Sequence, residues 1–391
     1  MKNPRFLALA ALAVLVGFGS STTASETSPM IRLDGAKLTA EAIDREVNAL
    51  MSTAEVVGLQ LALIHDGRVS YENVYGLRDA ARKLPMTRVT VTYGASLTKA
   101  AFAYLVMQLV DEKRIDLDTP IADYLPKPLP EYRRYAELGR DARWRQLTMR
   151  MLLSHTTGFA NFRFLEPDKK LKFHRDPGLR YGYSGEGIVL AQFVLETGLG
   201  IDVGTEMQKR IFDRFGMKRS SMTWRADFAA NYAENHQLDG KPYPHRRWEA
   251  AGAAGSLDTT AVDYAAFLAA VVRGEGLSEK AKAEMIRRQI DIDSERQFPT
   301  LTEARTGRWK PIQLGYGLGW GVFETPYGHA FFKEGHDEGT ANYVLCVQPR
   351  QACIVMLAND VRAEKIFVPL VRRLFGEVNL PADWEGFADA R

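Results

Sequence analysis

A serine and a lysine stand three residues apart at the start of an apolar run, in "YGASLTKAAFAYLVMQLVDEKR". On an α-helix, residues i and i+3 share a face, so the amine of Lys99 can point back at the hydroxyl of Ser96. Such an amine can take the proton of the serine and make it a nucleophile. Chance yields about one S-x-x-K in a chain of this length, and the alternative is a serine that caps a helix. The position of the pair, after a strand and at the opening of an apolar helix, favours the chemical interpretation.

Two later stretches carry further groups suited to proton transfer. Tyr183 stands just before a helix in "RYGYSGEGIVLAQFVLE", where a tyrosine usually serves packing. Lys333 falls in an otherwise apolar strand in "FFKEGHDEGTANYVLC", where a lysine can also serve to block edge-to-edge pairing. Gly335 and Gly339 would allow a ligand or another backbone to approach closely.

Together the three stretches resemble the signature of serine penicillin-recognising enzymes, and more narrowly the class C β-lactamase group with its DD-peptidases and family VIII carboxylesterases. "SLTK" matches S-x-x-K, "YSG" stands where the group has Y-x-N, and "KEG" stands where it has K-T-G or H-x-G. "MLLSHTTGF" is similar to the group's "LLSHTSGL", and "AAGSLDTTAVDYAAFL" to its "AGGL-STA-D-ARF" segment. The motifs occur in the group's order, and the resemblance covers residues 40–374.

The resemblance implies a catalytic role for each matching residue. Ser96 would accept the acyl group and Lys99 would relay its proton. Tyr183 would be general base in acylation and general acid toward the leaving group, beside Lys333. A phenol flanked by two ammonium groups has its anion favoured, so we expect the pKa of Tyr183 to fall toward neutrality. Whether Lys99 or Tyr183 takes the first proton stays open.

The substrate-binding residues implied by the resemblance are Gly185, Glu334, Gly335 and His336. The backbone N–H groups of Ser96 and His336 would form the oxyanion hole. Gly185 replaces an asparagine that contacts the side-chain amide of β-lactams. Glu334 replaces the usual Thr or Ser, next to the place of a substrate carboxylate. A carboxylate there repels an anionic β-lactam, so neutral esters and D-amino-acid amides rank ahead of β-lactams.

We therefore expect an exported serine hydrolase that forms an acyl-enzyme at Ser96 on a carboxylic ester, amide or β-lactam. The alternative is a non-catalytic or slowly acylated protein that binds penicillin or peptidoglycan fragments. No cofactor is expected, and zinc at His336-Asp337-Glu338 is disfavoured because adjacent strand residues point to opposite faces. A Ser–His–Asp triad is disfavoured because no G-x-S-x-G motif is present.

Three features near these motifs are expected to be structural. His155, in "LLSHTTGF", is interpreted as a hydrogen-bonded structural histidine because Tyr183 already supplies a base. Glu186 is interpreted as a solvated glutamate in the first turn of a helix, where the helix dipole favours it. The aromatic, basic run of residues 161–181 is expected to form a loop over the site, with its basic residues facing solvent.

Composition and the N-terminus bound the partners and the compartment. The chain has 391 residues, 46% of them apolar, and its net charge of +3 forms no basic stripe, which argues against nucleic acid. Lys2 and Arg5, the apolar run of residues 6–18 and the small residues of "STTAS" predict a signal peptide over residues 1–24. The run is shorter than the roughly 20 residues that cross a bilayer, so we expect a periplasmic or secreted protein without a stable membrane anchor.

Only two cysteines are present, Cys346 and Cys353, and they flank "VQPRQA". A two-residue turn at Pro349-Arg350 would set them opposite each other in a hairpin. An exported protein permits a disulfide there. Two buried free thiols are the other interpretation, which we favour.

The elements that must position these groups predict an α+β fold. Helical spacing covers residues 40–54, 97–111, 186–197, 205–215 and 260–273. Two strands joined at His65-Asp66-Gly67 lie early, and a series of antiparallel strands and a final helix lie late. We expect residues 25–95 and 306–391 to form one antiparallel sheet flanked by helices, with residues 96–305 as an inserted, mainly helical lobe. A substrate would bind between the two.

Overall fold

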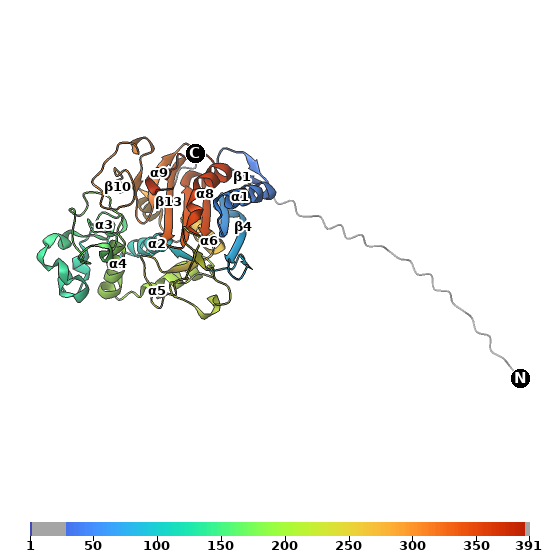
Figure 1. Ribbon diagram of the computed structural model, residues 1–391. Coiled ribbons are helices and arrows are strands. Elements are labelled where there is room, and N and C mark those ends of the chain that lie inside the picture. Colours follow the sequence, from blue (N-terminus) through green and yellow to red (C-terminus); the bar gives the residue numbers. More distant parts are fainter. Residues whose placement is uncertain (2–28, 388–391) are drawn as a thin grey trace.

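A nine-stranded antiparallel sheet forms the centre of the protein, whose computed structural model describes residue 1 and residues 29–387. The strands lie in the order β10-β11-β12-β13-β14-β15-β3-β4-β5 (Figure 1). Their bounds are β3 Gly58–His65, β4 Arg68–Asp79, β5 Leu84–Pro85, β10 Ile290–Asp291, β11 Gly315–Tyr316, β12 Gly321–Thr325, β13 Gly328–Asp337, β14 Thr340–Val347 and β15 Ala352–Ala358. β3 pairs with β15, so both ends of the chain build one sheet and the α+β prediction is confirmed. Apart from Met1, the expected signal segment lies outside the described residues.

Helices and three small sheets complete the described part of the chain. The α-helices are α1 Ala40–Ala54, α2 Leu97–Asp111, α3 Met149–Leu153, α4 Gly185–Phe193, α5 Val203–Met207, α6 Ala261–Arg273, α7 Glu279–Ile286, α8 Glu364–Leu370 and α9 Ala382–Glu385. The two-stranded sheets pair β1 Met30–Ile31 with β2 Lys37–Leu38, β6 Thr92–Ala95 with β9 Leu257–Thr259, and β7 Asn235–His236 with β8 Pro242–Tyr243. The expected helices over residues 40–54, 97–111 and 260–273 are confirmed. α4 and α5 are each followed directly by one π-helical segment, Val194–Gly198 and Gln208–Asp213.

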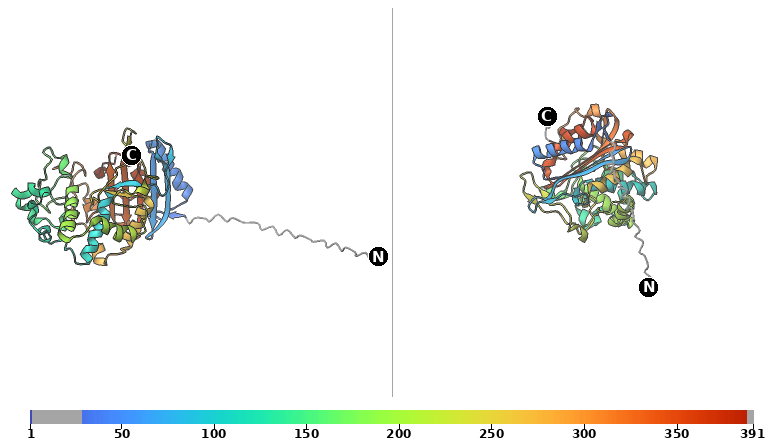
Figure 2. Two further views of the ribbon diagram at one scale, coloured as in Figure 1. Left: turned by 90° about the horizontal axis from the view of Figure 1, so that it is seen from below. Right: turned by 90° about the vertical axis from the view of Figure 1, so that its right-hand side faces the viewer.

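Helices cover both faces of the sheet (Figure 2). Successive side chains of a strand point to opposite faces, and on β14 both sets are buried. Val344 and Cys346 join the core cluster that contains α2 and α6. Tyr343 and Leu345 join the cluster that contains α1 and α8. The central strands are therefore apolar along their whole length rather than alternating between apolar and polar residues.

α2 is the helix on which the candidate nucleophile is placed, and it is enclosed by the rest of the fold. All its residues from Leu97 to Leu109 are buried. It contacts β13 of the sheet on one side and α5 and α7 on others. A helix buried all round is a rigid support for groups at its N-terminus.

The expected division of the chain into two lobes stays a prediction, and the position of α6 is relevant to it. This helix lies within the segment assigned to the helical lobe, yet it packs on β3, β4 and β15 of the sheet. Within residues 29–387, no single helix is long and apolar enough to cross a membrane, and the segments Gly185–Gly198 and Val203–Asp213 pass that test only as a pair bent by 103°.

The two cysteines form a disulfide, so the favoured prediction of free thiols is wrong. Cys346 and Cys353 are directly opposite each other on β14 and β15. The connection is the four residues from Gln348 to Gln351 rather than the expected two-residue turn, with Gln351 at a φ of 42°. The longer connection keeps the same register, which is what brings the two sulfurs together.

The basic residues of the 161–181 run do not all face solvent, which corrects the expectation. The side chains of Arg175 and Arg180 are nine-tenths buried. Arg175 pairs with Glu303 at 2.7 Å, and Arg180 pairs with Asp293 at 2.9 Å. These arginines fasten the run to the segment that leads into β11 instead of remaining hydrated.

Candidate active site

Ser96 is placed by a tight turn between β6 and α2. Ala95 adopts a left-handed backbone with a φ of 46°, a conformation that costs energy for a residue with a Cβ. Thr98 stabilises the turn, because its hydroxyl donates to the carbonyl of Ala95 at 2.6 Å and accepts from the backbone N–H of Leu257 at 3.0 Å. Ser96 follows as the N-cap residue of α2, but its side chain makes no capping hydrogen bond. The capping alternative is therefore wrong, and the hydroxyl is available for another partner.

That partner is the amine of Lys99. The Lys99 Nζ and Ser96 Oγ atoms lie 2.8 Å apart, and the amine also donates to the carbonyl of Ala254. Lys99 is buried, whereas Ser96 is partly exposed. Burial, followed by the nearby charge of Lys333, holds the pKa of Lys99 well below its usual range, against the opposing effect of Glu334. A neutral amine at this distance can accept the proton of the serine.

Tyr183 precedes α4 and faces both lysines. Its ring centroid lies 5.2 Å from Lys99 Nζ and 5.0 Å from Lys333 Nζ. Lys333 Nζ donates to the phenol oxygen at 3.3 Å. Ser184 caps α4 by accepting from the N–H of Gly187 at 3.1 Å, which fixes where the helix begins and hence where Tyr183 stands. The structure thus brings Ser96, Lys99, Tyr183 and Lys333 together.

His155 supports this arrangement rather than taking part in proton transfer. Its Nδ1 accepts from the backbone N–H of Ser184 at 3.1 Å, and its ring packs on that of Tyr183 with centroids 4.3 Å apart. Burial, with Lys99 and Lys333, holds its pKa well below the usual range, so the imidazole is neutral. The prediction of a hydrogen-bonded structural histidine is confirmed.

The pKa of Tyr183 moves in the direction opposite to the one expected. Burial raises it well above its usual range and Glu334 adds to the rise, while a hydrogen bond with Ser96 opposes them. The expectation failed because it counted two ammonium charges and no desolvation. Burial favours the neutral forms of the phenol and of Lys99 alike. The phenol therefore keeps its proton at neutral pH.

Lys333 lies on β13 and its side chain is turned into the protein rather than toward solvent, so the alternative of a lysine that blocks edge-to-edge pairing is wrong. It is fully buried, and burial lowers its pKa despite the opposing effect of Glu334. Gly335 permits the strand to approach α2: a Cβ there would lie 2.5 Å from the carbonyl oxygen of Gly94 and 3.2 Å from the backbone nitrogen of Leu97. Any side chain at position 335 would push β13 away from Ser96.

Glu334 is turned toward the lysine before it. Its Oε1 lies 2.6 Å from Lys333 Nζ and accepts from Gln297 Nε2 at 3.0 Å. Glu334 is buried, and its other oxygen, Oε2, makes no hydrogen bond. The chain therefore supplies its own carboxylate to the lysine beside the candidate nucleophile.

Gly185 is in contact with an aromatic ring. A Cβ at this position would lie 2.3 Å from two ring atoms of Phe162, so a side chain at position 185 and that ring cannot coexist. Glu186, one residue on, is buried and paired with Arg163 at 2.9 Å, which corrects the expectation of a solvated glutamate. The loop of residues 161–165 thus lies directly against the start of α4.

His336 follows Gly335 on a stretch of β13 that pairs with β14 but not with β12. Within the described residues, β12 pairs with β13 only as far as Phe332. The imidazole of His336 is half-exposed and bonds to Glu364 at 2.7 Å. Between residues 29 and 387, no group of three or more His, Cys, Asp and Glu side chains is arranged to hold a metal ion.

Four residues of the site were not singled out individually by the sequence analysis. Ala254 contributes its carbonyl to Lys99, and Asn161 accepts from the N–H of Gly185 at 3.0 Å. Gln297 bonds to Glu334, and Phe162 contacts Gly185. Ala254 lies in the quoted "AAGSL" stretch, which could have indicated it. Asn161 and Phe162 begin the 161–181 run that was expected to form a loop over the site, whereas Gln297 comes from a loop whose composition indicates no particular contact.

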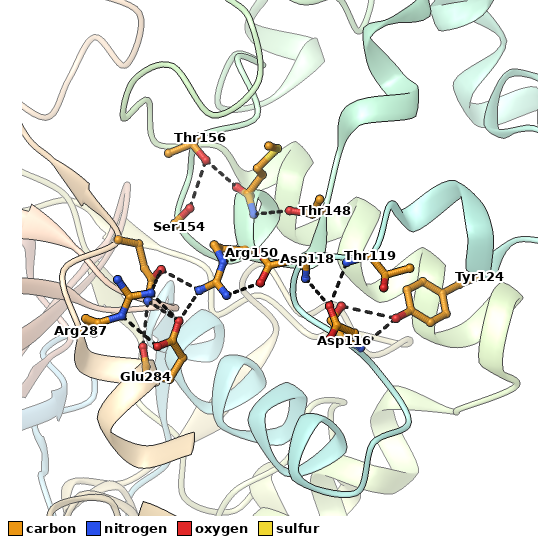
Figure 3. Close-up of polar contacts among 12 residues, drawn as sticks. Asp116, Asp118, Thr119, Tyr124, Thr148, Arg150, Ser154, Thr156, Glu284 and Arg287 are labelled. Atoms are coloured by element: carbon orange, nitrogen blue, oxygen red, sulfur yellow. Dashed lines mark hydrogen bonds and ion pairs between the residues drawn. The ribbon is translucent and has the colours of Figure 1, made fainter. Parts of the chain in front are cut away.

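A separate polar cluster adjoins a cavity of about 760 Å³ between α2, α3 and α7 (Figure 3). Arg150 bonds to Asp118 at 2.6 Å and 2.7 Å and also to Glu284, which Arg287 contacts in turn. The carboxylates of this cluster are paired with arginines or with backbone N–H groups. None of the residues around Ser96 lines this cavity, so we interpret the cluster as a structural link between α3 and α7.

Comparison with known proteins gives consistent matches. A sequence model of the family described as Beta-lactamase matches residues 43–374. Penicillin-binding protein 4 of Amycolatopsis lactamdurans is 25% identical over 362 residues, which are 85% of this chain and 88% of that protein. The octameric penicillin-binding protein homologue from Pyrococcus abyssi has a TM-score of 0.65 at 20% identity, covering 82% of this chain and 73% of that one. A class C beta-lactamase has a TM-score of 0.67 at 19% identity, covering 86% and 96%. These structures share the fold.

Proposed function

This chain belongs to the Beta-lactamase family, as its motifs predicted, and on that basis we propose that it is a serine hydrolase that forms an acyl-enzyme at Ser96. Its substrate is a carboxylic ester, an amide or a β-lactam. The observation that carries the proposal is the 2.8 Å contact between the hydroxyl of Ser96 and the buried amine of Lys99. An uncapped, partly exposed serine next to an amine whose pKa is lowered by burial is the arrangement that nucleophilic catalysis requires.

In the acylation step, the groups around Ser96 transfer protons in a defined order. The Ser96 Oγ–H bond breaks and its proton passes to Lys99 Nζ, while Oγ forms a bond to the carbonyl carbon of the substrate. The backbone N–H groups of Ser96 and His336 stabilise the oxyanion, an effect on the order of 2.7–4 kcal/mol for each donor. The carbonyl carbon then loses the leaving group, which takes a proton from Tyr183. The proton that Lys99 took from Ser96 then replaces the one that Tyr183 gave away.

Deacylation reverses these roles with water as the nucleophile. Water gives one proton to the amine of Lys99 and its oxygen to the acyl carbon, and the bond from that carbon to Ser96 Oγ breaks. The proton that Lys99 took from water then passes to Ser96 Oγ, and the acid product leaves with the second proton of the water. Lys333 keeps Tyr183 in place through the 3.3 Å hydrogen bond to the phenol. No metal is needed for any of these steps.

We also propose that the protein is exported to the periplasm or secreted. The N-terminal segment has the composition of a signal peptide. The disulfide between Cys346 and Cys353 supports the proposal, because disulfides persist mainly in oxidising compartments. Fractionation of expressing cells tests it: the mature protein should lack residues 1–24 and leave the cytoplasmic fraction.

A substrate panel tests the catalytic proposal. Chromogenic esters, a D-amino-acid anilide and a chromogenic cephalosporin are offered to the wild type and to Ser96→Ala, each with and without a chelator. We expect the wild type to turn over at least one of them, Ser96→Ala to be inactive, and the chelator to have no effect. Full turnover by Ser96→Ala contradicts the acyl-enzyme, and loss with chelator alone indicates a metal. Stoichiometric labelling by penicillin without turnover indicates the alternative, a penicillin-binding or peptidoglycan-binding protein.

A further inference from the structure

We propose that Phe162 and Glu334 make this site selective for an uncharged ester with an apolar group, an inference that rests on the proposed function. Each of the two side chains fills a place beside the candidate catalytic residues that could otherwise receive a polar or charged part of a substrate. Phe162 fills the space next to Gly185, and Glu334 accepts a hydrogen bond from the amine of Lys333. The two observations are independent and point to the same class of substrate.

The first observation concerns apolar surface around Tyr183 and Gly185. Phe162 lies on Gly185, and Phe164 stacks on Phe162 with ring centroids 5.1 Å apart and planes 12° apart. Phe298 packs edge-on against Tyr183 with centroids 5.6 Å apart. We call Phe162, Phe164 and Phe298 the aromatic rim.

Two of the three rings of the aromatic rim are exposed to solvent. Phe164 is 63% exposed and Phe298 is 47% exposed, although Tyr183 beneath Phe298 is buried. Exposed aromatic rings that gather beside a reactive group indicate a surface that a ligand covers. Position 185 has no side chain and its space is taken by a ring, so no amide from that position meets a polar acylamino group. The rim therefore fits an alkyl or aryl group.

The second observation concerns charge. Lys333 Nζ would attract a substrate carboxylate if it were unpaired. Instead it donates to Glu334 Oε1 at 2.6 Å, and Gln297 donates to the same oxygen. An anionic substrate would have to displace this pair and would lie next to a buried carboxylate, and like charges at such distances are strongly unfavourable. An uncharged ester leaves the pair intact.

A cationic substrate is the competing possibility, since Glu334 carries negative charge. Its unpartnered oxygen, Oε2, is buried and is not presented to solvent. Its other oxygen, Oε1, already accepts from two donors. An ammonium group would therefore find no solvent-accessible free acceptor at Glu334, and the geometry favours the uncharged ester.

Two series of p-nitrophenyl esters test the proposal. The first varies acyl length, from acetate to butyrate to hexanoate. The second varies charge at matched length: butyrate, the hemisuccinate anion and the 4-aminobutyrate cation. We expect kcat/KM of the wild type to rise along the first series and to favour butyrate over both charged esters by roughly tenfold or more.

The variants assign the selectivity to residues. Phe162→Ala and Phe298→Ala should each lower the hexanoate-to-acetate ratio of kcat/KM roughly tenfold. Leu179→Ala should leave this ratio unchanged, because Leu179 is an exposed leucine that lines a separate cavity with Trp309. Glu334→Gln should raise the hemisuccinate-to-butyrate ratio. Each readout is a ratio within one preparation, so partial misfolding of a variant does not alter it.

Specific outcomes overturn the inference. Equal turnover of butyrate and hemisuccinate by the wild type, or preference for the aminobutyrate ester, excludes selection for uncharged substrates. An unchanged chain-length ratio in both rim variants excludes the aromatic rim as the binding surface. Failure of the proposed function is distinct, because it appears as turnover of all these esters by Ser96→Ala whatever their ratios.

Discussion

The amine of Lys99 lies 2.8 Å from the hydroxyl of Ser96, at the N-terminus of a helix whose residues from Leu97 to Leu109 are all buried. The sequence left open whether Lys99 or Tyr183 takes the first proton. Burial favours Lys99 over Tyr183 in that role, because it lowers the pKa of an amine and raises that of a phenol. The proposed mechanism therefore assigns the serine proton to Lys99 and the donor role to Tyr183.

The pH dependence of kcat/KM should follow the protonation of Lys99. Below its lowered pKa the amine is protonated and cannot accept the serine proton, so ester hydrolysis should fall on the acid side and persist as pH rises. Lys99→Arg stays protonated throughout and should lose roughly 10²–10⁴-fold in kcat/KM at all pH values. A profile of wild type and variant on one ester checks this. A Lys99→Arg variant that keeps the wild-type rate would exclude Lys99 as the base.

Tyr183→Phe should be sensitive to the leaving group. Because the pKa of Tyr183 is raised, its phenol donates a proton to a departing alkoxide, whereas p-nitrophenolate departs without one. We expect the variant to lose roughly tenfold more kcat/KM on an alkyl ester than on the p-nitrophenyl ester of the same acid. Equal losses on both esters would show that Tyr183 does not act as the donor.

The disulfide should stabilise the β14–β15 hairpin. Closing a loop between Cys346 and Cys353, seven positions apart, is expected to contribute about 2 kcal/mol to the free energy of unfolding. Urea denaturation of the wild type and of the double variant Cys346→Ala/Cys353→Ala measures the difference. Mass spectrometry without reductant should find no free thiol in the wild type. Alkylation of both cysteines in the native protein would contradict the disulfide.

Glu284 should make stability depend on pH at the link between α3 and α7. Hydrogen bonds from Arg287 and then Arg150 lower its pKa to about 2, against the opposing effect of partial burial. The folded-state pKa lies below the unfolded value, so the stabilisation is complete above about pH 4.5 and is lost as pH falls toward about 2.

Glu284→Gln should accordingly reduce the free energy of unfolding on the order of 2 kcal/mol at pH 7. The gap to the wild type should narrow at pH 3. Urea titrations at both pH values, with Glu279→Gln as a control on the same helix, check the expectation. A gap that is independent of pH would mean that the ion pairs contribute nothing.

Much of the fold and part of the site could be predicted from the sequence. The bounds of α2 follow from its uninterrupted apolar run, and the three motifs pointed to Ser96, Lys99, Tyr183 and Lys333, which lie together. The sequence placed Cys346 and Cys353 opposite each other, as the structure does, but register alone could not decide whether they are bonded, because a disulfide also depends on the distance between the facing residues and on the redox compartment.

Burial and loop contacts account for what could not be predicted. The pKa of Tyr183 was misjudged because the sequence shows neighbouring charges but not desolvation. Glu186 appeared solvated because its partner, Arg163, comes from a loop without periodicity. Phe162 lies in the run that was expected over the site, but its contact with Gly185 could not be predicted for the same reason. Contacts made by irregular segments depend on the path of the whole chain, which local patterns do not encode.

The most direct test of the central claim is to identify the residue that carries the acyl group. Wild-type protein mixed with a slowly hydrolysed p-nitrophenyl ester is acid-quenched within one turnover, digested and mapped by mass spectrometry. The account predicts one acyl group per chain, on Ser96, and none in Ser96→Ala. Turnover without any adduct, or an adduct on another side chain, would contradict it.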